Sequence, residues 1–257
     1  MTATGNRRES GVLDMRKKLW WLVPLYIAAL LVFALLLYIG NYYPADADAV
    51  AAMASDETIR VLPTDFGWLF DGPSETDALI FYPGGKVAAE AYAPLCRALA
   101  QAGADVCLVR MPLRIALLGE NKAAEIIGSM DYERWTIAGH SLGGVCAALY
   151  ASKHPEKLAG VVMLASYATQ PLDDGLSALY IYGTEDGILN MERYKKNLTN
   201  APTQMEELVI EGGNHSQFGS YGMQTSDGVA RITPDEQVEQ TVKAIAGMIP
   251  ATDRGEG

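Results

Sequence analysis

The 257-residue sequence has few cysteines and a shortage of basic residues. Cys96, Cys107 and Cys146 are scattered through apolar segments, which is typical of small buried side chains and not of a disulfide framework. The chain has no HExxH motif, no paired histidines and no cysteine cluster, so we expect no metal and no cofactor. Lysine and arginine number 20 against 31 acidic residues, for a net charge of −11. Because phosphate binding requires a basic surface, we expect no nucleic-acid partner.

Internal repeats and low-complexity tracts are also missing. The composition is 49% hydrophobic and 20% charged, which excludes a disordered, collagen-like or disulfide-stabilised chain. These values predict one globular domain of roughly 200 residues with an additional segment.

The additional segment is an apolar run, Leu19–Ile39, with no charge between Lys18 and Asp46. Twenty-one helical residues extend about 32 Å, which is enough to cross a bilayer core of about 30 Å. We therefore predict a transmembrane helix over residues 19–40. Aromatic residues lie at both ends of the run, as in membrane-interface belts; they are Trp20, Trp21, Tyr38, Tyr42 and Tyr43.

Two alternatives compete with a retained anchor. The A-x-A sites between Ala45 and Ala49 keep secretion after signal cleavage open, although signal peptides have a shorter apolar region of about 7–15 residues. A buried core helix is disfavoured because the run has no polar face.

The flanking charges predict the orientation of the anchor. Arg16, Lys17 and Lys18 precede it, whereas acidic residues such as Asp46 and Asp48 follow it. The positive-inside rule places residues 1–18 in the cytoplasm and residues 41–257 outside. We interpret residues 41–57 as an Ala/Asp linker, 58–250 as the globular domain and 251–257 as a tail.

Short apolar runs alternate with longer helical patterns over the globular domain. Continuous runs such as ALIFY and VVML are typical of strands buried on both faces. The alternation predicts a mostly parallel, twisted, eight-stranded sheet with helices on both faces, and an antiparallel edge where no helix separates the first two strands. The expected strands are Ile59–Leu62, Gly67–Phe70, Ala78–Tyr82, Val106–Arg110, Trp135–Ala138, Gly160–Leu164, Ala178–Tyr182 and Glu207–Ile210, and the expected helices are Ala88–Gln101, Arg114–Met130, Leu142–Lys153, Met191–Asn200 and Pro234–Met248.

A G-x-S-x-G motif, Gly139–Gly143, lies between the expected strand RWTIA and the helix LGGVCAALYASK. A sharp turn from strand to helix requires small residues at both glycine positions, and it projects the Ser141 hydroxyl above the sheet edge. The helix N-terminus beneath the turn favours developing negative charge.

With its strand and helix order, this motif resembles the nucleophile elbow of the α/β-hydrolase fold, in particular the small branch called α/β-hydrolase fold-5. The resemblance implies an acid after a late strand and a histidine after the last one. It assigns Asp186 as the acid, with Glu185 second and Asp173 or Asp174 as remoter options. His215 is the histidine in the loop after the last expected strand.

The other two histidines have simpler interpretations. We expect the ring of His140 to point away from the site and to serve packing, and we expect His154 to lie at the surface.

The loop after the strand ALIFY, Tyr82–Lys86, contains Gly84 and Gly85. By the same resemblance it supplies one backbone N–H of an oxyanion hole, from Gly85 or, second, Lys86, and Leu142 supplies the other.

Together these residues predict a serine hydrolase that cleaves carboxylic esters through an acyl-enzyme, outside the cytoplasm and attached to the membrane. About a dozen residues separate Leu164 from Ala178, where many relatives insert a cap, so we expect an open site for a small ester or acyl substrate. The segment 218–228 after His215 is either a pocket wall or a lid. Two alternatives are a catalytically silent binding module and a membrane protein that docks partners. The sequence leaves the oligomeric state undefined.

Overall fold

The computed structural model describes residues 6–249, so the expected tail 251–257 and the first five residues lie outside the described part. The chain divides into two compact units, with the boundary after Tyr42. The first unit is the helix α1 (Asn6–Gly40). Its segment Trp20–Gly40 has a mean hydropathy of 2.7, and none of it is buried. Its length and composition suit a membrane span.

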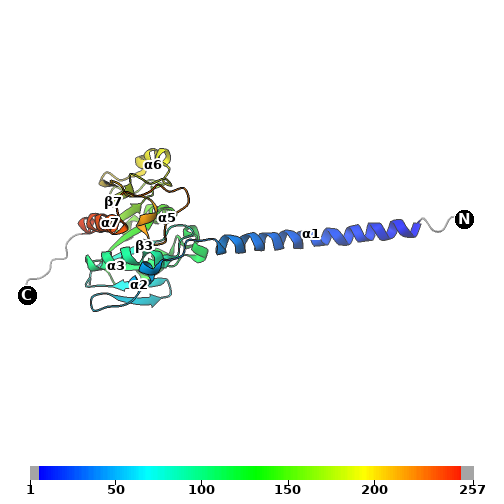
Figure 1. The fold of residues 1–257 in the computed structure, drawn as a ribbon, viewed down its shortest axis with the longest axis horizontal. Coiled ribbons are helices and arrows are strands. Elements are labelled where there is room, and N and C mark those ends of the chain that lie inside the picture. Colours follow the sequence, from blue (N-terminus) through cyan, green and yellow to red (C-terminus); the bar gives the residue numbers. More distant parts are fainter. Residues whose placement is uncertain (1–5, 250–257) are drawn as a thin grey trace, which may run out of the picture. The chain divides into compact units, whose positions relative to one another are not determined.

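The second unit is an α/β fold (Figure 1). Its sheet has the strand order β1-β2-β4-β3-β5-β6-β7-β8. Strands β3 to β8 are parallel, whereas β2 runs antiparallel to both β1 and β4, as expected for this edge. The strands are β1 (Arg60–Thr64), β2 (Gly67–Asp71), β3 (Asp77–Tyr82), β4 (Asp105–Val109), β5 (Arg134–His140), β6 (Gly160–Leu164), β7 (Ser177–Gly183) and β8 (Met205–Ile210).

Helices cover both faces of this sheet, as the buried strands require. Alternate side chains of β3 point to opposite faces: Ile80 belongs to one apolar core and Leu79 to the other. The first core includes side chains from α4 (Lys122–Ser129), α5 (Leu142–Lys153) and α6 (Met191–Asn197). The second includes side chains from α3 (Ala93–Gln101) and α7 (Pro234–Met248).

The segment expected to be a linker is structured from Tyr43 onward. Tyr43 pairs with Val87 in a short parallel bridge. Helix α2 (Ala47–Ala52) follows, capped by Asp46, whose side chain accepts from the Ala49 N–H. Ala49 is fully buried. The Ala/Asp composition hid this helix because only one of its side chains is buried.

The expected helix Arg114–Met130 is also different, because only its second half is α-helical, as α4. The first half consists of two short 3₁₀ turns, η2 (Pro112–Arg114) and η3 (Ala116–Gly119). Leu113 and Arg114 have φ values of 52° and 57°, in the left-handed region that cannot continue a right-handed helix. Further 3₁₀ turns are η1 (Ala89–Tyr92), η4 (Pro155–Lys157), η5 (Leu198–Asn200) and η6 (Ser216–Phe218).

Candidate active site

Ser141 lies on the sharp turn between β5 and α5, with φ 52° and ψ −122°. This conformation is rare for a residue with a side chain and is typical of functional sites. The flanking glycines are needed for it. A Cβ on Gly139 would lie 2.5 Å from backbone atoms of Gly143, and one on Gly143 would lie 2.2 Å from the carbonyl oxygen of Tyr82.

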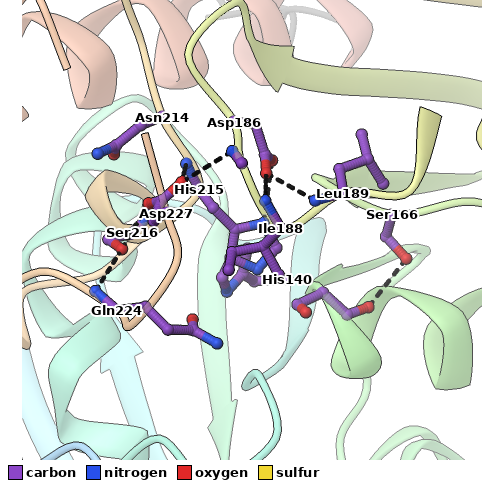
Figure 2. A network of polar contacts seen from close by, with 12 residues as sticks. His140, Ser166, Asp186, Ile188, Leu189, Asn214, His215, Ser216, Gln224 and Asp227 are labelled. Carbon is purple, nitrogen blue, oxygen red and sulfur yellow. Dashed lines mark hydrogen bonds and ion pairs between the residues drawn. The ribbon is translucent and has the colours of Figure 1, made fainter. Parts of the chain in front are cut away.

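Two hydrogen bonds to β6 and its following loop hold the turn. The Ser141 N–H donates to the Leu164 carbonyl at 2.9 Å, and the Ser166 hydroxyl donates to the Ser141 carbonyl at 2.9 Å (Figure 2). Both main-chain groups of Ser141 are therefore fixed, and the strained backbone is stabilised by its neighbours. The sequence alone did not indicate Ser166, because its role depends on a neighbouring parallel strand.

The structure brings His215 and Asp186 together. His215 Nδ1 lies 2.9 Å from Asp186 Oδ2, and both side chains are almost fully buried. The other oxygen of Asp186 accepts from the N–H groups of Ile188 and Leu189, at 2.8 and 2.7 Å (Figure 2). These bonds fix the carboxylate so that it faces the imidazole and selects the tautomer with the proton on Nδ1.

His215 Nε2 is buried and has no hydrogen-bond partner in the described part of the chain. A neutral imidazole held at Nδ1 by a carboxylate presents a lone pair at Nε2. This is the atom that can accept a proton, and an unpaired buried nitrogen of this kind calls for a functional explanation.

The alternative acids have other partners. Glu185 forms an ion pair with Arg231. Asp173 accepts from the Gly175 N–H, and Asp174 accepts from Thr203. Asp186 is therefore the only one of the four that contacts His215 among the residues described.

Gly85 and Leu142, the two residues with expected oxyanion donors, lie side by side. A Cβ built on Gly85 would be 3.2 Å from Leu142 Cδ2. The second candidate, Lys86, uses its backbone N–H to donate to the Arg114 carbonyl at 3.1 Å. The N–H of a first helical residue such as Leu142 has no intrahelical partner. The geometry favours Gly85 over Lys86.

The prediction that the ring of His140 points away from the site was wrong. Its ring does not point away from the site but packs on His215, with ring centroids 4.4 Å apart (Figure 2). Its Nδ1 lies 2.8 Å from the Tyr92 hydroxyl, which also accepts from the Gly84 N–H at 3.0 Å. Burial lowers the pKa of His140 well below 6.5, and the nearby His215 lowers this pKa further. His140 is therefore neutral at physiological pH.

A buried amide fixes the loop that carries His215. The Gln237 side chain, on α7, accepts from the Asn214 N–H at 3.0 Å and donates to the Asn214 carbonyl at 2.8 Å. Both main-chain groups of the residue before His215 are thus held by one side chain. Gln237 was missed because the helical pattern of α7 gives no sign of which polar residue faces inward.

No cluster of three or more histidine, cysteine, aspartate or glutamate side chains within the described residues could hold a metal ion. What the arrangement offers is a serine on a strained turn, a histidine with an available nitrogen and a buried carboxylate behind it. They follow β5, β8 and β7 at one edge of the sheet, and such a set suits nucleophilic acyl transfer.

Solved structures with the same fold include several esterases and hydrolases. The carboxylesterase CesB from Bacillus subtilis has a TM-score of 0.53 at 11% identity, covering 84% of this chain and 99% of its own. A methylesterase from Arabidopsis has a TM-score of 0.51 at 14% identity, over 67% and 100% of the two chains. A dienelactone hydrolase from Anabaena variabilis has a TM-score of 0.56 at 14% identity, over 75% and 97%.

A comparison with curated proteins finds no match. The family model described as "Alpha/beta hydrolase family" matches residues 78–239, which is more than half of the chain and includes the elbow, the acid loop and the histidine loop. The chain belongs to the α/β-hydrolase family.

Proposed function

We propose that this protein is a membrane-anchored serine hydrolase that cleaves carboxylic esters or related acyl bonds. One observation carries the proposal: His215 is held at Nδ1 by buried Asp186 at 2.9 Å and keeps Nε2 unpaired. Ser141 is presented at the same sheet edge on a turn of φ 52°. The esterases among the structural neighbours are consistent with this reaction class.

The reaction follows from the chemistry of these groups. Ser141 Oγ attacks the acyl carbon while its proton passes to His215 Nε2. Asp186 stabilises the imidazolium that forms. The N–H groups of Leu142 and Gly85 stabilise the tetrahedral oxyanion, each worth roughly 3 kcal/mol. His215 then donates its proton to the leaving oxygen, and water, activated by His215, releases the acid from Ser141.

The space around the site favours small or exposed esters. No α-helix lies between the end of β6 at Leu164 and the start of β7 at Ser177, where a cap domain would close the site. Beside the site, the segment 218–228 is tied down by hydrogen bonds, including Ser220 N–H to the Ala91 carbonyl at 2.7 Å. This supports its role as a fixed pocket wall in preference to a lid.

The first experiment treats the detergent-solubilised full chain with a fluorophosphonate, locates the label by mass spectrometry and measures turnover of p-nitrophenyl esters of increasing acyl length. We expect a label on Ser141 and turnover of short esters. Ser141→Ala should abolish both with an unchanged far-UV circular dichroism spectrum. Ser152→Ala, on the same helix α5, is the matched control and should remain fully active. A folded chain with no label and no turnover would favour the binding-module alternative.

The anchor and its orientation are tested separately. The three native cysteines are buried, so a cysteine introduced on the exposed side of α7, Glu239→Cys, is selectively reactive. Labelling of intact cells with a membrane-impermeant maleimide, together with retention in the membrane after alkaline washing, is the expected result. A labelled protein released by the wash would support secretion after cleavage.

A further inference from the structure

Asp227 lies at the end of the loop that follows His215, and its side chain is surrounded by hydrogen-bond donors. The residue is only 8% exposed. Its Oδ2 accepts from the Ser216 N–H at 2.8 Å and from the Ser216 hydroxyl at 2.6 Å. Its Oδ1 accepts from the Gly187 and Gly228 N–H groups at 3.1 and 2.9 Å. One buried carboxylate thus collects four short hydrogen bonds.

The donors belong to two different loops. Ser216 directly follows His215, and Gly187 directly follows Asp186, so Asp227 joins the loop of the proposed base to the loop of the proposed acid. The His215 N–H also approaches Asp227 Oδ1, at 3.4 Å. The two loops are in close backbone contact here, since a Cβ on Gly228 would lie 2.0 Å from the Glu185 carbonyl oxygen.

We propose that Asp227 is a positioning residue that holds the imidazole of His215 in register with the carboxylate of Asp186. This inference rests on the proposed function. Asp227 acts on the main chain beside each residue of the pair and contacts neither Nδ1 of His215 nor the carboxylate of Asp186. Hydrogen bonds to an ionised acceptor are roughly twice as strong as neutral ones, which suits a carboxylate here.

An amide cannot replace this carboxylate. Three of the four bonds to Asp227 come from backbone N–H groups, which can only donate, and each carboxylate oxygen accepts at least one of them. A carboxylate accepts at both oxygens, whereas an amide accepts at one and donates at the other. In Asp227→Asn, the amide nitrogen would face either Ser216 or the Gly187 and Gly228 N–H groups. One of the two loops would therefore lose its attachment.

The chain offers a matched control in Asp105, which is 1% exposed. Its carboxylate accepts from the Gly72 N–H at 2.9 Å and from the Tyr132 hydroxyl at 2.6 Å. Like Asp227 it is a buried carboxylate that ties loops together, but it lies at the start of β4, at the opposite end of the parallel strands. Asp105→Asn reports the effect of losing such a carboxylate without touching the site.

The titratable groups that face His215 come from three elements. They are Asp186 after β7, His140 at the end of β5 and Asp227 in the loop after β8. Tyr221 is in the same loop as Asp227, and after burial, the charges of Asp227 and Asp186 further raise the pKa of its hydroxyl. Loss of the Asp227 charge, or a looser pair with Asp186, destabilises the protonated imidazole. Either change moves the acid limb of the kcat/KM profile to lower pH.

The test measures p-nitrophenyl acetate hydrolysis by full-chain Asp227→Asn, Asp227→Glu and Asp105→Asn from pH 4.5 to 8.5. A misplacement of about 1 Å costs about 100-fold in rate. We expect Asp227→Asn to lower kcat 10- to 100-fold with little change in KM, and to shift the acid limb to lower pH. Asp227→Glu should recover part of the rate. Asp105→Asn should lower the melting temperature and leave kcat and the pH profile unchanged.

Two results would contradict a positioning role for Asp227. A folded Asp227→Asn variant with wild-type kcat and pH profile would overturn the inference, as would an equal loss of kcat in Asp105→Asn. If Asp227→Asn does not fold, Ser216→Ala removes the 2.6 Å bond to Asp227 together with the 2.9 Å bond from the Gln224 N–H, and an unchanged pH profile in that variant overturns the inference. Turnover that survives Ser141→Ala would instead refute the proposed function, whatever the Asp227 variants do.

Discussion

The imidazole ring of His140 packs against the imidazole ring of His215, with centroids 4.4 Å apart and a tilt of 54°. The first residue precedes the proposed nucleophile, and the second is the proposed base. The Tyr92 hydroxyl accepts from the Gly84 N–H and lies 2.8 Å from His140 Nδ1, to which it can donate. A continuous set of contacts therefore links the loop that contains Gly85 to the ring of the base.

His140 makes the stability of the protein depend on pH. Its pKa in the folded chain is well below 6.5 because it is buried beside His215. In the unfolded chain a histidine binds a proton near pH 6.5. The contribution of His140 to the free energy of unfolding is therefore fully present above that pH and is lost as the pH falls below it. We expect the free energy of unfolding to decrease by about 1.4 kcal/mol per pH unit in this range, through this group.

The measurement is urea unfolding at pH 7.5, 6.0 and 5.0. His140→Asn should remove this component of the pH dependence, and His154→Asn, at the end of α5, is the control that should keep it. An identical pH dependence in wild type and His140→Asn would contradict the assignment.

The loss of kcat/KM at low pH should reflect the binding of one proton, to His215. Because His140 stays neutral, the acid limb of kcat/KM reports the proposed base alone. We expect kcat/KM to fall as the pH is lowered, with a limiting slope of about tenfold per pH unit, because a protonated imidazole cannot accept the proton of Ser141. Steady-state kinetics with p-nitrophenyl acetate measure this directly. Activity that is flat from pH 4 to 8 would remove His215 from the role of base.

Gly84 and Gly85 should respond differently to alanine. A Cβ on Gly84 would lie 2.7 Å from the Tyr92 hydroxyl oxygen and 3.0 Å from His140 Nδ1, both of which are buried. Overpacking of this kind typically costs about 1–3 kcal/mol. A Cβ on Gly85 would meet the Leu142 side chain, with Cδ2 at 3.2 Å and Cβ at 3.6 Å, so Leu142 would have to move by a few tenths of an ångström.

We therefore expect Gly84→Ala to lower the melting temperature, and Gly85→Ala to leave it nearly unchanged while lowering kcat roughly tenfold. Differential scanning calorimetry and ester kinetics on the same samples separate the two effects. Gly103→Ala is a control for the effect of backbone strain without a steric clash. Nothing lies within 4 Å of a Cβ at this position, and only the φ of 110° opposes the substitution. Full activity in Gly85→Ala would argue against an oxyanion donor at this position.

Features set by neighbouring residues in the chain were predictable from the sequence. The helices Leu142–Lys153 and Pro234–Met248 were predicted with the bounds that the structure has. The second begins with a capping box between Thr233 and Glu236, a local signal. The alternation of apolar runs likewise predicted the eight strands and the antiparallel edge, because it reflects burial on one or both faces.

Contacts between distant segments that the family resemblance does not specify were not predictable. The Tyr92–His140 pair joins two buried residues 48 positions apart, and the pattern of either segment reads only as apolar core. Asp227 sits in a loop rich in glycine and serine whose composition predicts exposure. Its burial results from Ser216 and Gly187 closing around it, which requires the folded sheet.

Tyr43 contacts segments on two sides of the site. Its N–H donates to the Lys86 carbonyl at 2.8 Å, and its carbonyl accepts from the Ala88 N–H at 2.9 Å. Its hydroxyl accepts from the Thr225 N–H at 3.2 Å, in the loop after His215. Tyr43 thus connects the chain just beyond Gly85 with the loop that ends at Asp227.

We expect Tyr43→Ala to lower kcat/KM for p-nitrophenyl acetate several-fold, because the loop after His215 loses the hydroxyl contact with Thr225 and the ring contact with Tyr221, and a small displacement has a large effect on rate. Tyr43→Phe keeps the ring and the backbone pairing and should lose less. Val50→Ala, an exposed position on α2, is the control and should match wild type. If Tyr43→Ala has wild-type kinetics while remaining folded, the segment that follows the apolar helix serves only as a connection. If kcat/KM decreases in the order wild type, Tyr43→Phe, Tyr43→Ala, this segment is part of the framework of the site, because only the side-chain contacts of residue 43 differ among the three proteins.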